Sequence, residues 1–187
     1  MENNMLKTEN MIRENRTEGM RKQMFLNVLG QYVPSEMVEY LGKKGFFIKP
    51  AAINYHGNYE GGLFDHSFEV MKCLVHMTKK LDIKWQNERS PYIVGMFHDL
   101  CKMDDYIKDG QKWTYNNSPV ITGHGEKSVM LLSQFITLTE EEILCIRYHM
   151  GAYRPDDWDS FDMAIREHES VLWTHTADMY ASKVKNI

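Results

Sequence analysis

The sequence predicts an all-α protein with one small β-hairpin. Apolar residues recur three and four positions apart through most of the chain, which is the spacing of helices with one buried face. Strand-like alternation is confined to a short segment near 105–116, where Asp109-Gly110 is expected to form the turn. The length of 187 residues and the hydrophobic content of 43% fit a single domain with a sizeable core.

The N-terminal part is expected to contain two helices. Residues 1–15 are polar and lack an apolar period, so we expect this segment to fray. A helix is predicted over 16–33 and a shorter one over 34–42, which together form the N-terminal helices 16–42 of a single domain over 16–187. The segment 45–56 that follows has few helix signals and is expected to connect the two parts of the domain.

The remaining helices carry clearer boundary signals. Gly61-Gly62 is expected to open a helix where another backbone segment approaches closely. Ser90-Pro91 places a capping residue and a proline at a helix start, and Thr139 with Glu142 forms a capping-box pattern. The predicted helices cover 63–81, 90–102, 125–136, 140–149 and 161–184.

Composition and charge narrow the classes of partner. The net charge of −4 gives no general attraction to nucleic acid, so a nucleic-acid partner is possible but not indicated. No apolar stretch approaches the roughly 20 residues that span a bilayer, and residues 1–7 lack a signal-peptide pattern, so we expect a cytoplasmic protein without membrane contact. Cys73, Cys101 and Cys145 are widely spaced in apolar contexts, which is typical of reduced core cysteines rather than of a zinc–thiolate site.

The most informative polar pair is His98-Asp99, which lies within the apolar run 92–102. A buried imidazole beside a buried carboxylate is costly unless something pairs with both, and a divalent metal ion would do so. Each further candidate has an ordinary alternative, such as a capping residue or a core histidine, but together they fit a metal site in a helical bundle over 56–182. These candidates are His66, His124, His149 and Asp178.

In their order, these residues resemble the HD superfamily of metal-dependent phosphohydrolases. The matching motifs are Gly61-Gly62-Leu63-x-x-His66-Ser67, His98-Asp99-Leu100-x-Lys102, Gly123-His124-Gly-Glu-Lys-Ser128, Tyr148-His149 and Thr176-Ala-Asp178, and they extend over about residues 40–182. One departure is Cys101, where many relatives have glycine, and we expect it to alter local packing more than ligation.

The resemblance implies an all-α bundle of five or more helices and a site for one or two metals. His66, His98, Asp99 and Asp178 would hold the first ion. Asp99 would bridge to a second ion completed by His124 and His149. Mixed imidazole and carboxylate ligands suit Mn, Fe, Co, Ni or Zn, whereas the number of imidazoles disfavours Mg.

Other residues near these motifs are candidates for catalysis or substrate binding. Asp99 would act through the metals, and Lys102 is expected to contact a substrate phosphate, although it could equally be a solvated lysine at a helix end. His56 could protonate the leaving oxygen as a general acid, or be an ordinary loop histidine. Lys127 is a weaker phosphate ligand, and Tyr55 could stack on a base, although loop packing is the commoner use of such an aromatic residue.

The sequence therefore favours a metal-dependent phosphomonoesterase or phosphodiesterase. Its substrate is expected to be a small phosphate ester, such as a nucleotide or short oligonucleotide, hydrolysed by a metal-activated water. Two alternatives are a di-iron oxygenase of the same fold and a nucleotide sensor without catalytic activity. The sequence leaves the oligomeric state open.

Overall fold

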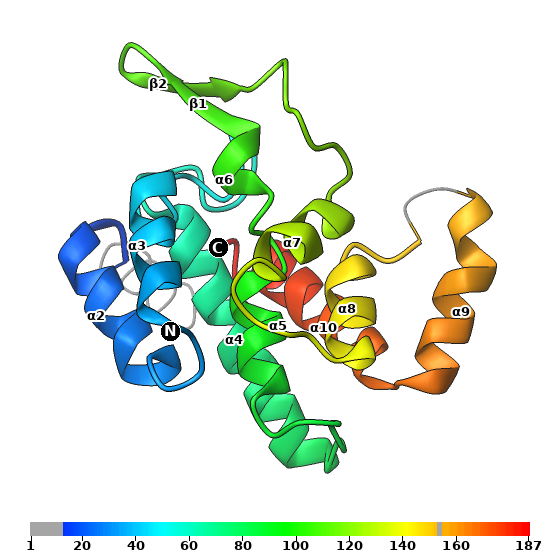
Figure 1. The fold of residues 1–187 in the computed structure, drawn as a ribbon. Helices are drawn as coiled ribbons and strands as arrows, with labels where there is room; N and C mark the ends of the chain where they lie inside the picture. Colours follow the sequence, from blue (N-terminus) through cyan, green and yellow to red (C-terminus); the bar gives the residue numbers. More distant parts are fainter. Residues whose placement is uncertain (1–12, 153–154) are drawn as a thin grey trace.

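The structure is a computed structural model that describes residues 13–152 and 155–187. It is helical with one two-stranded antiparallel hairpin, which confirms the predicted fold class (Figure 1). Its helices are α2 (Glu18–Leu29), α3 (Ser35–Lys44), α4 (Gly62–Leu81), α5 (Ser90–Phe97), α6 (Lys102–Asp105), α7 (Gly125–Leu132), α8 (Glu140–Arg147), α9 (Trp158–Glu167) and α10 (Ser170–Met179). A 3-10 turn, η1 (Pro155–Asp157), precedes α9, and a π turn, η2 (Tyr180–Val184), continues α10. No helix in the described part of the chain is long and apolar enough to cross a membrane.

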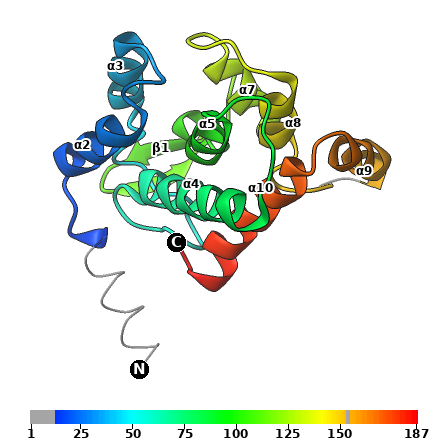
Figure 2. The same cartoon turned by 90° about the horizontal axis from the view of Figure 1, so that it is seen from below.

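The centre of the fold is the packed pair α4 and α5, with α2 and α3 on one side and α8 and α9 on the other (Figure 2). The two central helices approach closely at Gly95, where a Cβ atom would lie 2.4 Å from the Cα atom of Met71. Gly61 and Gly62 allow a similar approach at the start of α4, because a Cβ on Gly62 would lie 2.0 Å from the Gly57 carbonyl oxygen. The Gly95 contact holds α5 against the middle of α4, and the Gly62 contact holds the loop at Gly57 against the start of α4.

The N-terminal helices close one end of the core through aromatic packing. Five buried phenylalanines contact one another in edge-to-face and tilted arrangements: Phe25, Phe46, Phe47, Phe64 and Phe97. The segment predicted to fray lies outside the described residues over 1–12. At its described end, Arg13 is buried and donates to Glu69 of α4 at 3.3 Å.

The hairpin consists of β1 (Tyr106–Asp109) and β2 (Lys112–Tyr115) and projects away from the helices (Figure 1). Asp109 pairs with Lys112, so the two loop residues are Gly110 and Gln111. The turn therefore lies one residue later than predicted. Gly110 adopts φ +60°, a left-handed conformation that glycine adopts without strain.

The prediction of one continuous C-terminal helix over 161–184 is wrong, because the structure has two helices there, α9 and α10. His168 is extended, with φ −138° and ψ 105°, and it separates α9 from α10. The buried Ser170 begins the new helix and donates to Glu141 of α8, which fixes this start against the core. The sequence does not indicate this break, because Phe161, Ala164 and Val171 keep a helical apolar spacing across it.

Candidate metal centre

Six side chains from distant parts of the chain meet at one buried cluster between the central helices. We call this group the His/Asp cluster, and its members are His66 in α4, His98 and Asp99 after α5, His124 before α7, His149 after α8 and Asp178 in α10. Within each of three overlapping groups, the ligand atoms all lie within 4.8 Å of one another. These groups are His66, His98 and Asp99; His98, His149 and Asp178; and Asp99, His124 and His149. The structure thus brings together all six residues that the sequence offered as metal ligands.

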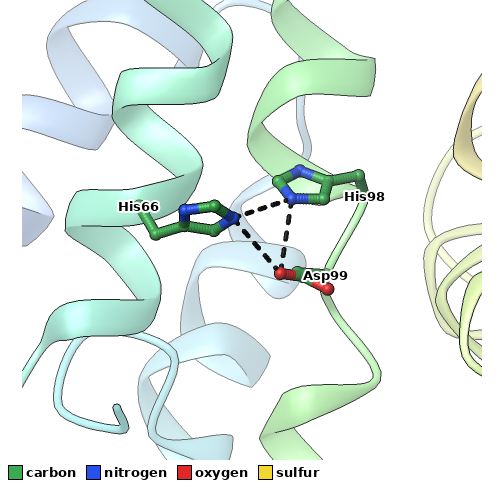
Figure 3. A group of neighbouring side chains, drawn as sticks. All are labelled: His66, His98 and Asp99. Carbon is green, nitrogen blue, oxygen red and sulfur yellow. Dashed lines mark hydrogen bonds and ion pairs between the residues drawn. The ribbon is translucent and has the colours of Figure 1, made fainter. Parts of the chain in front are cut away.

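The His98-Asp99 pair lies at the end of α5 rather than inside a continuous helix over 90–102. The helix ends at Phe97, and the next backbone bonds are tight ones, from Leu100 to Phe97 and from Lys102 to Asp99. Each of these bonds spans three residues rather than the four of a regular helix, so the chain after Phe97 departs from the path of α5. Figure 3 shows the rings of His66 and His98 and the carboxylate of Asp99 pointing toward one another.

His149 also lies beyond the helix predicted to contain it. Helix α8 ends at Arg147, two residues earlier than expected, and His149 is fully buried in the turn that follows. The other three ligands stand where they were predicted, and His66 lies near the start of α4. His124 is the residue that precedes α7, and Asp178 lies within α10.

Three of the four imidazoles are held in the same way. Their Nδ1 atoms lie 2.7 to 2.9 Å from the backbone carbonyl oxygens of Ile187, Gly95 and Ile146, for His66, His98 and His149 respectively. A carbonyl oxygen can only accept, so each Nδ1 carries the proton that it donates. The Nε2 atoms consequently face the cluster, which is the orientation typical of metal-bound histidines with a supporting partner.

The inward-facing atoms lack enough hydrogen donors among themselves. The Nε2 atoms of His66 and His98 are 3.2 Å apart. Within the described residues, Asp99 Oδ1 and His149 Nε2 are buried without a hydrogen-bond partner, although His124 Nε2 lies 2.9 Å from Asp99 Oδ1. Buried acceptors that converge with too few donors are costly, and a cation at their centre would satisfy them.

The two oxygens of Asp99 face different imidazoles. Oδ2 lies 3.5 Å from His66 Nε2 and 3.3 Å from His98 Nε2. Oδ1 lies 2.9 Å from His124 Nε2 and 3.5 Å from His149 Nε2. This arrangement has the form of a carboxylate shared between two ion positions.

Asp178 lies on the same side of Asp99 as His66 and His98. Its Oδ1 lies 3.2 Å from His66 Nε2 and 3.9 Å from His98 Nε2. The donor set is therefore imidazole nitrogen and carboxylate oxygen on both sides of Asp99, which fits divalent transition metals. The buried groups can hold a metal ion, and the donors do not single out one metal.

Without an ion, a lysine and a proton balance the charge of the cluster. Lys102 Nζ lies 2.6 Å from Asp99 Oδ2, and both side chains are buried. Burial opposes ionisation of Asp99, but the charges of Lys102 and His98 prevail and hold its pKa well below the usual range. Burial likewise opposes protonation of His66, yet hydrogen bonds to Asp178 and Asp99 raise its pKa to about 9. A metal ion must displace that proton before His66 can bind it.

His124 differs from the other imidazoles in its Nδ1 partner and in its exposure. Its Nδ1 lies 3.1 Å from the sulfur of Cys101, and its side chain is 35% exposed while those of His66, His98 and His149 are fully buried. Cys101, Asp105 and His124 also offer ligand atoms within 4.8 Å of one another. The position of Cys101 was expected to affect packing more than ligation, and its contact with His124 was not foreseen.

The predicted substrate-binding and catalytic residues lie in different surroundings. His56 is near the cluster, with its ring centroid 4.8 Å from that of His66. Tyr55 is 74% exposed on the same loop, and its contact with a substrate stays a prediction. Lys127 is buried and its amine lies 2.7 Å from carboxylate oxygens of both Asp104 and Asp105, so this amine is already held by two anions.

One curated protein resembles part of this chain. The dihydroneopterin 2',3'-cyclic phosphate phosphodiesterase of Methanocaldococcus jannaschii is 37% identical over 62 residues, which is 32% of this chain. The match covers 25% of that relative's length. No family model matches the chain, and no solved structure matches it.

Proposed function

We propose that this protein is a metal-dependent phosphohydrolase of the HD type that acts on a small, nucleotide-like phosphate ester. One observation carries the proposal. The two oxygens of buried Asp99 face two separate sets of imidazole Nε2 atoms, and three of the four imidazoles are held at Nδ1 by carbonyl oxygens.

The chemistry of such a centre suits phosphate esters. Bound divalent ions lower the pKa of a water ligand and neutralise the charge that builds on phosphate oxygens. His66, His98, Asp99 and Asp178 would hold one ion, and Asp99, His124 and His149 the other. The similarity to a phosphodiesterase of a cyclic phosphate supports the same reaction class.

Lys102 is proposed to contact the substrate phosphate. Its amine sits 2.6 Å from Asp99 Oδ2, where it neutralises the carboxylate when no ion is bound. Burial works against its charge, but Asp99 outweighs burial and raises the pKa of Lys102, so it stays protonated. With metal ions bound at Asp99, this ammonium group would be available to pair with a phosphate dianion or monoanion.

His56 is proposed to donate the proton to the leaving oxygen. Burial, then the neighbouring His66 and Lys102, lower the pKa of His56 to about 4, so it is neutral in the protein without substrate. Its Nε2 is buried and has no partner within the described residues. An anionic phosphate beside it would favour the protonated ring, which supports a role confined to the substrate complex.

The experiment is a metal analysis followed by a hydrolysis screen. The purified protein is analysed for Mn, Fe, Co, Ni and Zn, and it is then tested with nucleoside monophosphates, di- and triphosphates and with 2',3'- and 3',5'-cyclic nucleotides. We expect hydrolysis that chelation abolishes and one of these metals restores, with loss of both metal and activity in Asp99→Ala.

The same screen decides between this function and its two alternatives. Oxygen uptake by the iron-loaded protein, without hydrolysis under any metal, would favour an oxygenase. Tight nucleotide binding by the metal-loaded protein, without turnover, would favour a sensor. Hydrolysis by Asp99→Ala at the rate of the unmodified protein would contradict the proposal.

A further inference from the structure

A cavity of about 740 Å³ opens beside the His/Asp cluster. It lies between the start of α7, the end of α8 and the segment before α9, and its lining includes His124. His124 is also 2.9 Å from Asp99 Oδ1 and is the most exposed of the four imidazoles. The cavity therefore begins where the cluster reaches the surface, and its volume is in the range of small-molecule sites.

The walls of this cavity combine a fixed cation with open apolar side chains. Arg147 Nε lies 2.8 Å from Glu126 Oε1, and its Nη2 lies 3.5 Å from Asp157 Oδ1. Its guanidinium carbon also lies 4.8 Å from the ring centroid of Tyr148. These three contacts hold the guanidinium plane in one place, where a second planar ring can stack on it.

Two methionines leave apolar surface in the same cavity. Met130 is 54% exposed and Met150 is 46% exposed. Gly125 keeps the start of α7 close to the end of α8, because a Cβ there would lie 2.5 Å from the Arg147 carbonyl oxygen. Flexible thioether side chains around a rigid guanidinium are suited to a flat apolar face rather than to a charged group.

The charge of the lining shows which part of a phosphate ester belongs here. Within the described residues, the guanidinium of Arg147 is already paired with the carboxylates of Glu126 and Asp157. This pairing disfavours a phosphate at Arg147, and the phosphate would instead be held near Lys102 and the cluster. The carboxylates can accept hydrogen bonds from ring N–H and amino groups.

We propose that this cavity binds the heterocyclic part of the substrate, and that it prefers a ring with N–H and amino donors on one edge, as in guanine or pterin. This inference rests on the proposed function for the placement of the phosphate. The ring would stack on Arg147, cover Met130 and Met150, and direct its donor edge to Glu126 or Asp157.

The test compares a substrate that has a base with one that has none. The test measures hydrolysis of guanosine 2',3'-cyclic phosphate and of glycerol 1,2-cyclic phosphate. It does so for the unmodified protein, for the cavity variant Met130→Ala/Met150→Ala and for a control variant, Met20→Ala/Met163→Ala. The control methionines are 53% and 62% exposed and lie outside the cavity, so both pairs should fold normally. We expect the KM for the guanosine substrate to rise about tenfold in the cavity variant alone, with kcat and the glycerol substrate unchanged.

A second comparison tests the donor edge. Adenosine 2',3'-cyclic phosphate should show a KM about tenfold above that of the guanosine substrate. Equal KM values for the two nucleotides would overturn the assignment of the edge. Equal KM values for the guanosine substrate in both double variants would overturn the site.

Binding of guanosine itself separates this inference from the proposed function. Equilibrium dialysis should give a dissociation constant about tenfold weaker in Met130→Ala/Met150→Ala than in the control pair. If no ester is hydrolysed, the proposed function fails while guanosine binding still decides the cavity. Absence of guanosine binding, or equal binding by both variants, would overturn the inference.

Discussion

Asp65 and Asp99 are both buried carboxylates, with side chains 0% and 2% exposed, but their surroundings differ. Asp65 Oδ1 accepts from Arg16 at 2.7 Å, and Oδ2 accepts from Arg21 Nε and Nη2 at 3.2 and 3.0 Å. Asp99 has one close cation, Lys102, and otherwise faces imidazole nitrogens. The first carboxylate accepts from two arginines, whereas the second is paired with Lys102 and lies among buried groups that could hold a metal ion.

This difference separates a structural use of buried charge from a functional one. Arg21 is itself buried and also donates to the carbonyl oxygens of Arg13 and Arg16, so the Asp65 group fastens the N-terminal segment onto α4. Because Asp65 precedes His66, the same anchor holds the start of the helix that carries a metal ligand. At Asp99, by contrast, Lys102 and a proton on His66 balance the charge, and a metal ion can take the place of that proton.

The largest expected effect on stability comes from breaking the satisfied carboxylate. Asp65→Ala leaves Arg21 buried without its anion, so the free energy of unfolding should fall by about 3 to 5 kcal/mol. Denaturant titration followed by circular dichroism measures it. Asp162→Ala is the control, because the Asp162–Arg166 pair is exposed and its loss should leave the free energy of unfolding nearly unchanged. Equal losses in both variants would contradict the structural role of Asp65.

The next effect concerns the proton on His66 in protein freed of metal. Its pKa is about 9 in the folded protein and near the ordinary 6.5 when unfolded. Between these values the folded state holds a proton that the unfolded state has released, so stability should fall as pH rises. The full change is about 3 kcal/mol, most of it between pH 6.5 and 8.5, below the pH at which unfolded thiols titrate.

Urea titrations of chelated protein across pH 6.5 to 8.5 measure this slope. The matched variant, His66→Gln, removes the titrating group and should flatten the dependence. A slope that is absent in the unmodified protein, or that persists in His66→Gln, would contradict the claim that a proton on His66 stabilises the metal-free fold.

The smallest effect concerns the sulfur beside His124. Cys101→Ala removes the Nδ1 partner of His124. The affinity for the ion proposed at Asp99, His124 and His149 should therefore fall about tenfold, while the affinity for the other ion is unaffected. Calorimetric titration of the chelated protein measures the two affinities. Cys145→Ala is the control, because Cys145 is buried and contacts Ser170 rather than the cluster. Identical titrations for both variants would leave Cys101 with a packing role only.

The helices and the hairpin could be predicted because periodicity and capping residues are local properties. The boundaries at 98, 148 and 168 could not, since tight turns and the extended His168 do not interrupt the apolar spacing. The six ligands could be proposed from the family motifs. The main-chain oxygens that hold the imidazole rings could not be predicted. His66, for example, is held by the main-chain oxygen of Ile187, 121 residues away, and a pattern of side chains does not indicate which backbone acceptor lies nearby.

The cavity beside His124 was also beyond sequence reasoning. Arg147 and Asp157 carry no motif, and their contacts depend on how α8 meets the segment before α9. The role of Lys127 as a phosphate ligand stays a prediction. The structure adds a contact that the sequence did not predict, because Asp104 and Asp105, which precede the hairpin, hold its amine.

The central claim is that Asp99 joins two ion positions, and the stoichiometry of metal binding tests it most directly. Chelated protein is dialysed against Mn²⁺ or Co²⁺ and analysed for bound metal per chain. The proposal predicts two ions in the unmodified protein, one in His124→Ala and none held tightly in Asp99→Ala. One ion or none in the unmodified protein, or the same stoichiometry in Asp99→Ala, would contradict the claim.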